Sequence, residues 1–398
     1  MSPRKKTRES SYKAGYGIKD IDRSFLILLI ALLVFGVVMI YNATGVYSQG
    51  AFGGAYRFAL LQVGWLGIGL LGFYFFFKLD FDTLRRISLS LFGIALLSLV
   101  VLSLANLFSG CGSGGLIFAP CVNGAHRWLY VNPPPLPQIP LLGVLGFQPS
   151  EFAKLALVIY LGVLLDKFVR NKEKPFWVFI IVVGLTSVLV LMQPNMSTAA
   201  LLFIIGLSMY FVSGASLAPL VALLPPLFLA GVGFILSSDY RRARLLTFLN
   251  PAESGDLSLG YHIRQIQIAL GSGGLWGLGF GQSRQKFQYL PEVAADSIFA
   301  IIGEEFGFIG TAVFILIFSF FIYKGFMLAK DSTTLLGRLL ATGITTWIAV
   351  QFFVNVAAMT RLIPLTGVPL PLVSYGGSSL VFSLMGLGLL ANISARNS

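Results

Sequence analysis

Apolar stretches long enough to form membrane helices alternate with polar links along most of this chain. A helix needs about 20 apolar residues to cross a bilayer, and about ten stretches approach or reach that length. They cover residues 24–42, 57–77, 87–106, 150–166, 176–192, 197–213, 217–237, 297–323, 337–358 and 376–393. The pattern predicts an all-α polytopic membrane protein with about ten transmembrane helices and a large extracytoplasmic loop between helices 7 and 8.

The composition supports this prediction, because 56% of the 398 residues are hydrophobic and only 11% are charged. Soluble domains do not have that balance. The formal net charge is +12, and seven basic side chains lie within the first 23 residues. This basic tail is too long and polar for a signal peptide, so we expect the first helix to be retained. An anchor beside anionic lipid is favoured over a nucleic-acid patch, and no nucleic-acid partner is expected.

Basic residues recur in alternate links, at residues 78–86, 167–174 and 324–338. By the positive-inside rule, these links and both termini are predicted to be cytoplasmic. The chain then divides into a cytoplasmic basic tail (1–23), a membrane domain (24–393) and a cytoplasmic tail (394–398). The same topology puts three loops on the outer side, where they can form a composite site: 107–149, 238–296 and 359–375.

The second of these loops and the start of the following helix are unusually rich in charge for a membrane boundary, where charge is costly. The candidates are Arg241, Arg242, Arg244, Lys286, Glu292, Asp296, Glu304 and Glu305. Guanidinium groups match phosphate oxygens, so the basic members suit a phosphate ligand. A solvated basic face is an equal alternative. Glu304 and Glu305 can pair with cations, line a polar cavity or be structural.

Asp296 lies where the eighth apolar stretch begins. A carboxylate is favoured at a helix N-terminus, so helix capping is one interpretation. The functional alternative is a general base at the membrane surface that accepts a proton from a substrate hydroxyl. Spacing alone favours the cap.

Glu151 and Lys154 are three residues apart, which places them on one face of the fourth predicted helix. A structural ion pair is favoured over a catalytic one. The chain has only two histidines, His126 and His262. They form no cluster with the cysteines in the pattern that zinc requires, so a zinc site is not expected.

Cys111 and Cys121 both fall in the first outer loop, and an even pair in an oxidising compartment predicts a disulfide. Two free thiols are the alternative. The proline run at 133–137 should be stiff and extended. Residues 260–270 can form a short amphipathic interfacial helix. The glycine-rich stretch 271–281 either approaches a ligand through its backbone or is a flexible connector.

Taken together, the chain resembles the SEDS family (shape, elongation, division and sporulation) from about residue 20 to residue 393. The resemblance depends on an ordered set of blocks, each weak alone. They are GAHRW at 124–128, FQPSEFAK at 147–154, QPN at 193–195, FLNP at 248–251, GY at 260–261, GSGGL at 271–275, YLPE at 289–292, Asp296, PLTGVPLP at 364–371 and SYGGSS at 374–379. The block at 301–305 favours the division and sporulation branch over the elongation branch.

The resemblance implies a peptidoglycan glycosyltransferase with ten spans in the bacterial cytoplasmic membrane. Such an enzyme polymerises lipid II into a nascent glycan strand on the outer face of the membrane. It works with a class B penicillin-binding protein and other divisome or elongasome proteins. A lipid II flippase and a non-catalytic scaffold for the penicillin-binding protein are the alternatives. In a scaffold, Asp296 would be only a cap.

The resemblance assigns the essential aspartate to Asp296, which would act as the base. Its pKa must then be raised above the usual value of about 3.9 by burial or by Glu292 and Glu304. Substrate and pyrophosphate binding is assigned to Arg241, Arg242, Arg244, Lys286, Glu292, Arg127 and Trp128. A divalent cation such as Mg²⁺ or Mn²⁺ can assist them, and no other cofactor is expected. The supporting polar residues are Glu151, Lys154, Gln193, Glu304, Glu305, Ser374 and Ser378.

The chain departs from the family pattern at four places. Ala294 and Ala295 replace the usual His-Thr, Asn195 replaces an aspartate, and Arg361 replaces a glycine. The loop with the cysteines is also longer than usual. These changes affect the expected positioning of the acceptor, but they leave Asp296 and the arginines in place.

Overall fold

The computed structural model describes residues 17–108, 111, 116–122, 124–133, 136, 145–216, 218–237, 239–250, 257–287 and 289–397. This part of the chain is mostly helical. Its α-helices are α1 (Arg23–Phe52), α2 (Arg57–Lys78), α3 (Phe81–Phe108), α4 (Pro149–Arg170), α5 (Phe176–Leu191), α6 (Met196–Val212), α7 (Ala218–Leu236), α8 (Asp239–Leu249), α9 (Leu257–Ser272), α10 (Ile298–Asp331), α11 (Leu335–Met359) and α12 (Gly377–Asn397). A short 3₁₀ helix, η1 (Ile18–Asp20), precedes them. The predicted basic tail lies mostly outside the described residues.

Two pairs of very short antiparallel strands interrupt the loop between α3 and α4. Strand β1 (Cys121–Val122) pairs with β2 (Ala125–His126), with Cys121 opposite His126. Strand β3 (Leu129–Tyr130) pairs with β4 (Gly146–Phe147). These strands were not predicted from the sequence. The predicted extended proline run lies largely outside the described residues.

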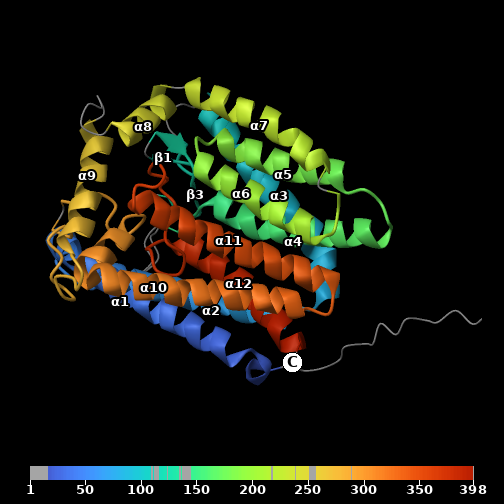
Figure 1. Cartoon of the computed structure of the whole chain (residues 1–398), viewed down its shortest axis with the longest axis horizontal. Coiled ribbons are helices and arrows are strands. Elements are labelled where there is room, and N and C mark those ends of the chain that lie inside the picture. The colour runs from blue at the N-terminus through green and yellow to red at the C-terminus, as the bar shows by residue number, and fades with distance from the viewer. Residues whose placement is uncertain are drawn as a thin grey trace, which may run out of the picture.

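The long helices run together along one axis of the molecule, with α8, α9 and the strands toward one end of the bundle (Figure 1). Helices α11 and α12 form its centre, because 78% and 83% of their apolar windows are buried. Helices α1, α2, α3 and α10 bury 39% or less and lie at the periphery. Their exposed side chains are largely apolar, as expected for helices that face lipid rather than water.

Each of the ten predicted apolar stretches corresponds to a helix, α1–α7 and α10–α12. Among the described residues, six helices are long and apolar enough to cross a membrane: α1, α2, α3, α10, α11 and α12. Helices α5 and α6 are apolar but shorter. The chain is therefore a multi-pass membrane protein, while the count of ten spans stays a prediction. Helix α12 runs to Asn397, so the predicted tail 394–398 is largely the end of a helix.

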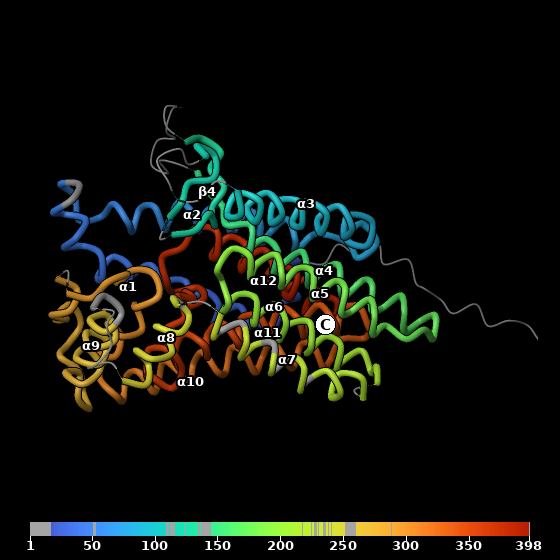
Figure 2. The backbone as a smooth tube through the Cα atoms, turned by 90° about the horizontal axis from the view of Figure 1, so that it is seen from above, coloured from blue at the N-terminus to red at the C-terminus, as the bar shows by residue number. Residues whose placement is uncertain are grey.

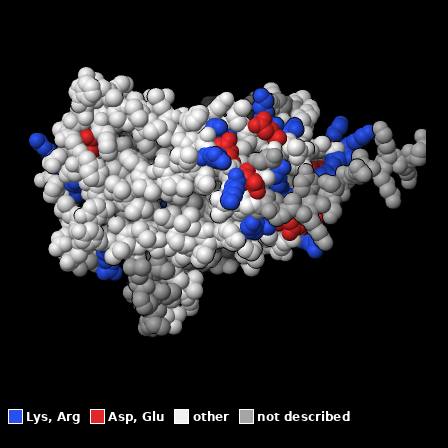
Figure 3. Space-filling model, turned by 90° about the horizontal axis from the view of Figure 1, so that it is seen from below, with Lys and Arg blue, Asp and Glu red and all other residues white. Residues whose placement is uncertain are grey.

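Ion pairs gather where α1 and α3 begin and α4 and α10 end. Arg85 pairs with Asp82 and Asp166 at 3.0 and 3.3 Å, and Lys324 pairs with Asp22 at 3.3 Å. Figure 3 shows charged side chains concentrated on one part of the surface beside a broad uncharged band. This charge lies in and next to the links that the sequence predicts to be cytoplasmic.

Helix α10 is broken near its start, which the apolar stretch 297–323 did not reveal. Gly307 has φ 65° and ψ −169°, so the helical hydrogen-bond ladder is interrupted there. The carbonyls of Glu304 and Glu305 instead accept hydrogen bonds from the amides of Leu278 and Gly279, both at 3.0 Å. Backbone groups at the break therefore find their partners in the glycine-rich segment.

The same segment also supplies acceptors for the second half of α10. The amides of Phe308 and Ile309 donate to the carbonyls of Gly274 and Leu275 at 2.8 and 3.1 Å. The tube in Figure 2 shows α9 and α10 lying side by side at this end of the bundle. The glycine-rich stretch is therefore packed against α10, and the interpretation as a flexible connector is wrong.

We expect Gly277→Ala to destabilise the protein. Gly277 has φ +82°, and a Cβ there would lie 2.1 Å from the carbonyl oxygen of Glu305. Backbone strain of this kind costs about 1–3 kcal/mol before the clash is added. Thermal unfolding of the detergent-purified protein measures the loss. Gly271→Ala is the control, because no heavy atom lies within 4 Å of the position its Cβ would take. Equal melting temperatures for the two variants would contradict the expectation.

Candidate functional site

Asp296 lies in a tight turn that leads into α10. Glu292 has φ +50°, and its carbonyl accepts hydrogen bonds from the amides of Ala295 at 3.0 Å and Ser297 at 3.3 Å. Ser297 is the N-cap residue of α10, and its side chain makes no capping bond. Asp296 thus does not occupy the cap position that spacing alone suggested.

One carboxylate oxygen of Asp296 has no hydrogen-bond partner in the described part of the chain. Its Oδ1 is buried, whereas buried carboxylate oxygens are usually hydrogen-bonded. Gly367 lies close to the other oxygen, since a Cβ at that glycine would be 3.7 Å from Oδ2. A larger residue at position 367 would narrow the space beside the carboxylate. The arrangement leaves Asp296 able to accept a proton or a hydrogen bond from a bound molecule.

Burial and the nearby Glu292 carboxylate raise the pKa of Asp296 to about 7, while Arg244 and Ser297 act in the opposite direction. An ordinary aspartate has a pKa of about 3.9 and is a weak base at neutral pH. At a pKa near 7 the carboxylate is matched to proton transfer at neutral pH. Glu292 and Glu304 were both expected to raise the pKa of Asp296, and Glu292 does so.

The loop between α11 and α12 wraps around the Asp296 turn. Asn355, buried on α11, donates from Nδ2 to the carbonyls of Asp296 and Val368, both at 2.8 Å. The amide of Tyr375 donates to the carbonyl of Ala294 at 2.7 Å. The second and third predicted outer loops therefore meet at this site. The sequence analysis did not select Asn355, although it is a polar residue within the apolar stretch 337–358.

His262 comes from α9 and contacts the other end of the turn. Its Nε2 lies 2.8 Å from Ser297 Oγ. Burial and the positive charge of Arg244 lower the pKa of His262 to about 4. The imidazole is therefore neutral at pH 7, and it orients Ser297 without adding charge beside Asp296. Neither His262 nor Ser297 was selected as a site residue from the sequence.

The three arginines of α8 point in two directions. Arg241 and Arg242 donate to groups at the end of α7, at 3.0 and 3.1 Å. Arg244 donates to the carbonyl of Leu365 at 3.4 Å, and its charge acts on Asp296. Of the predicted phosphate-binding arginines, Arg244 is thus the one whose charge reaches the carboxylate. Phosphate binding by all three stays a prediction.

The first outer loop contacts the link between α5 and α6. Arg127 donates to the carbonyls of Gln193 at 3.1 Å and Pro194 at 2.9 Å. Gln193 is buried and donates to the carbonyl of Leu99 at 3.2 Å. Trp128 is half-buried. Arg127 therefore holds the family's Gln-Pro motif, and the substrate role assigned to it and to Trp128 stays a prediction.

The link between α5 and α6 in turn reaches the loop beside Asp296. Asn195 caps α6 by accepting a hydrogen bond from the amide of Thr198 at 3.2 Å. Ser197 donates to the carbonyl of Thr366, next to Gly367, at 3.2 Å. Asparagine caps a helix about as well as aspartate, so this departure from the family pattern preserves the local structure.

Lys286 is buried away from solvent and is already paired. Its Nζ lies 3.4 Å from Glu305 Oε1, 2.9 Å from Asn42 Oδ1 and 2.6 Å from the carbonyl of Gly281. The predicted pyrophosphate ligand is therefore neutralised by a carboxylate in this structure. The sequence left a pairing of Glu305 with a cation open, but it could not reveal the contact with Asn42, which is 244 residues away.

Glu304 faces the glycine-rich side of α10 as well. Its carboxylate accepts hydrogen bonds from Ser272 Oγ at 3.4 Å, from Ser283 Oγ at 2.5 Å and from the amide of Arg284 at 3.0 Å. Glu304 therefore anchors the segment that follows α9, and its expected contribution to the pKa of Asp296 stays a prediction.

Glu151 and Lys154 form the predicted ion pair within the bundle. The two side chains are buried and lie 2.7 Å apart. Lys154 also donates to Gln351 Oε1 at 2.9 Å and lies 5.0 Å from the ring centroid of Trp347. This network joins α4 to α11. The predicted ion pair is confirmed, and the preference for a structural role over a catalytic one stays a prediction.

The same network reaches the loop around Asp296. Gln351 donates to the carbonyl of Pro369 at 3.1 Å. Ser374 Oγ accepts a hydrogen bond from the amide of Leu370 at 2.8 Å. Ser378 Oγ accepts one from the amide of Gln148 at 3.1 Å. Of the predicted supporting residues, Ser374 fixes the third outer loop, and Ser378 joins the start of α12 to the end of the first outer loop.

Cys111 and Cys121 form a disulfide, as predicted. The bond joins Cys111, which follows α3, to the first residue of β1. His126 lies near both sulfur atoms, but its Nδ1 contacts the carbonyl of Ala119 at 2.5 Å. Because the two sulfurs are bonded to each other, they are not available as thiolate ligands for zinc.

The fold and the site define a multi-pass membrane protein with a buried carboxylate, a nearby arginine and several converging loops at one end of its bundle. The profile of the FtsW/RodA/SpoVE family, described as "Cell cycle protein", matches residues 22–398. The chain belongs to this family, which confirms the resemblance seen in the sequence.

Curated relatives support the same assignment. The chain is 37% identical to the stage V sporulation protein E of Bacillus subtilis, covering 94% of this chain and 96% of that protein. It is 34% identical to the probable peptidoglycan glycosyltransferase FtsW of Trichlorobacter lovleyi, covering 96% and 94%.

Solved structures confirm the fold. One is described as "Structural coordination of polymerization and crosslinking by a peptidoglycan synthase complex", with a TM-score of 0.71, 26% identity and coverage of 95% of this chain and 98% of that chain. The rod shape determining protein RodA of Thermus thermophilus matches with a TM-score of 0.64, 25% identity and coverage of 94% and 96%.

We expect Lys286→Met to destabilise the fold, because it leaves the buried Glu305 carboxylate without its cation. Breaking such a buried pair costs about 3–5 kcal/mol. Adding Glu305→Gln to the same protein should restore part of the loss. Arg284→Met is the matched control at an exposed cation two residues away, with an expected change within about 0.5 kcal/mol. Thermal unfolding of the four proteins checks this, and an unchanged midpoint for Lys286→Met would contradict it.

Proposed function

We infer that this chain is a peptidoglycan glycosyltransferase that polymerises lipid II on the outer face of the bacterial cytoplasmic membrane. The observation that carries the proposal is the Asp296 carboxylate, whose Oδ1 is buried and has no hydrogen-bond partner among the described residues, and whose pKa is raised to about 7. Membership of the FtsW/RodA/SpoVE family supports the reaction. Relatives at 33–34% identity are named probable peptidoglycan glycosyltransferases.

In the proposed reaction, Asp296 accepts the proton of a sugar hydroxyl on the acceptor. The acceptor oxygen forms a bond to the anomeric carbon of the donor glycan. The bond from that carbon to the pyrophosphate oxygen breaks, and its electron pair leaves with undecaprenyl pyrophosphate. Attack from the opposite face inverts the anomeric carbon. General-base catalysis of this kind contributes about 10²–10⁴-fold to a rate.

The leaving pyrophosphate needs positive charge near the carboxylate. Arg244 is the best candidate, because its charge already acts on Asp296 and its side chain reaches the loop at Leu365. Arg241 and Arg242 lie on the same helix and can extend the cationic surface. We assign a smaller part to Lys286, because its ammonium is paired with Glu305.

We propose that a divalent cation, Mg²⁺ or Mn²⁺, assists the cationic side chains. Hard cations prefer oxygen ligands, and the pyrophosphate oxygens of the substrate would supply them. When bound there, the ion would neutralise the developing pyrophosphate charge. Asp296 is assigned to the base and not to the ion.

We propose ten membrane spans with both termini in the cytoplasm. The Asp296 end of the bundle would then face outward, as the basic links near Arg85, Arg170 and Lys324 favour. A class B penicillin-binding protein is the proposed partner. The similarity to a peptidoglycan synthase complex that couples polymerisation to crosslinking supports this partner. Similarity to sporulation and FtsW relatives favours a role in division or sporulation over elongation.

The two alternatives have no specific observation in their favour. A flippase path through Glu151, Lys154, Gln193 and Asn195 would need groups that are free to contact a headgroup. Each of the four instead makes a structural hydrogen bond or ion pair. A scaffold would use Asp296 as a helix cap, which is not its position.

We expect Asp296→Asn to lower glycan polymerisation from purified lipid II by about 100-fold or more, because the amide cannot accept the proton. The assay is run with the candidate class B partner present. Asp239→Asn, at the start of α8, is the matched control and should retain activity. Equal polymer from Asp296→Asn and the parent protein would remove Asp296 from the mechanism.

Polymerisation should fall as the pH drops below about 7, because Asp296 must be ionised to act as a base and its pKa is raised to about 7. Glu292 raises that pKa, so Glu292→Gln should move the acid limb of the pH–rate profile to lower pH. The measurement is the rate at saturating lipid II across a pH series. Glu173→Gln, an exposed carboxylate on a different loop, should leave the limb in place. An alkaline shift for Glu292→Gln would contradict the assignment.

A further inference from the structure

Arg361 occupies a backbone position that favours glycine. Helix α11 ends at Met359, and Arg361 follows with φ +58°. The amide of Arg361 donates to the carbonyl of Ala358 at 3.2 Å, and that of Leu362 to Ala357 at 2.8 Å. These are the two bonds of a Schellman motif, whose left-handed residue is usually glycine. An arginine here carries a conformational cost that glycine would avoid.

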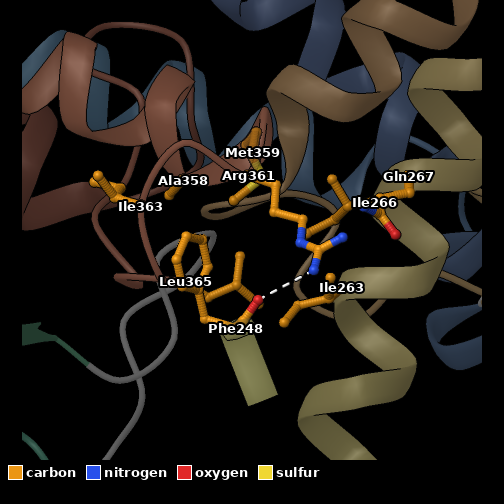
Figure 4. A pocket seen from close by; sticks show the side chains of 9 residues that line it. All are labelled: Phe248, Ile263, Ile266, Gln267, Ala358, Met359, Arg361, Ile363 and Leu365. Carbon is orange, nitrogen blue, oxygen red and sulfur yellow. Dashed lines mark hydrogen bonds between the residues drawn. The ribbon is translucent and has the colours of Figure 1, made fainter. Parts of the chain in front are cut away.

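The side chain of Arg361 makes a contact that a glycine could not make. Its Nη2 donates to the carbonyl of Phe248 at 3.1 Å, and Figure 4 shows the side chain crossing a small pocket to reach it. Phe248 lies in the last turn of α8, where carbonyls lack helical partners and a cation is favoured. Apart from Arg361 and Gln267, the pocket wall is apolar and includes Ile263, Met359 and Leu365.

A second bond joins the same two segments in the opposite direction. Arg244, on α8, donates to the carbonyl of Leu365, four residues after Arg361. Each segment thus provides one arginine and one backbone carbonyl to the other. Gly367, two residues after Leu365, lies beside the Asp296 carboxylate. The paired contacts connect the end of α8 to the wall of the site.

We propose that Arg361 is a positioning residue that latches α8 to the loop between α11 and α12 and thereby holds Arg244 beside Asp296. Arg361 itself does not touch the reacting atoms. The inference deepens the proposed glycosyltransferase function, on which its kinetic consequences rest. It also explains why the chain keeps an arginine where the backbone favours glycine.

The charged groups that act on Asp296 determine the kinetic signature of the latch. Glu292 raises the pKa of Asp296 and Arg244 lowers it, while His262 is neutral behind Ser297. If the latch opens, Arg244 moves away and its effect weakens. The pKa of Asp296 then rises, and the acid limb of the pH–rate profile moves to higher pH. A purely structural role for Arg361 would lower activity at every pH and leave the limb in place.

Arg361→Gly removes the latch and relieves the backbone at the same time. We expect its melting temperature to equal or exceed that of the parent, while amide hydrogen exchange in the last turn of α8 accelerates. Loss of one ordinary hydrogen bond corresponds to roughly tenfold faster exchange. Polymerisation should show a higher KM for lipid II and an acid limb at higher pH. Arg361→Lys, which keeps a cation, should recover part of both effects.

Lys172 provides a matched control. It follows α4 with φ +58°, is exposed, and occupies the same position in a second Schellman motif, with Glu173 donating to Phe168 at 3.0 Å. Lys172→Gly should relieve its own turn without changing α8 exchange, the KM or the acid limb.

Parent-like α8 exchange in Arg361→Gly overturns the latch, whatever the activity. Faster exchange with an unchanged KM and acid limb overturns its positioning role. If the parent protein makes no polymer with its partner, the proposed function fails, whereas the exchange measurement still tests the latch.

Discussion

Backbone groups outside the regular helices must find hydrogen-bond partners within the protein, and the position of Asp296 depends on how they do so. Near the start of α10 the glycine-rich segment supplies those partners, with Glu304 and Glu305 anchoring it through their side chains. Asn355 performs the same task for the turn itself by joining Asp296 to Val368. These hydrogen bonds run between the loops, so the loops around the carboxylate hold one another in place.

The buried lysines and the arginines of the loops have different kinds of partner in this fold. Lys154 and Lys286 are buried beside carboxylates. Their hydrogen bonds to Gln351 and Asn42 join segments that are far apart in sequence. Arg127, Arg244 and Arg361 instead donate to backbone carbonyls of neighbouring loops. Arginine suits this task because its planar group presents several donors while keeping its charge. The carboxylate of Asp296 is left without such a partner on one oxygen, which is the property that a base requires.

The sequence predicted what depends on local pattern. The ten apolar stretches all became helices, the Cys111–Cys121 disulfide formed, and Glu151 paired with Lys154, because periodicity, compartment and i,i+3 spacing determine these features. It did not predict the break in α10 or the burial of Lys286. Both depend on long-range contacts, with the glycine-rich segment and with Asn42. Asn355 and His262 were missed for the same reason, since only the fold brings them to the Asp296 turn.

In cells, the oxidation state of Cys111 and Cys121 would report which side of the membrane their loop occupies. Thiols stay reduced in the cytosol and are oxidised outside it. The disulfide and Arg127 both lie in the loop between α3 and α4. Arg127 donates to the carbonyl of Gln193, just before α6, and Ser197 of α6 donates to the carbonyl of Thr366 beside the site. The redox state of two sulfur atoms, read by thiol alkylation in intact cells, is therefore a built-in reporter of the orientation of the whole bundle. It reports that orientation without any added tag.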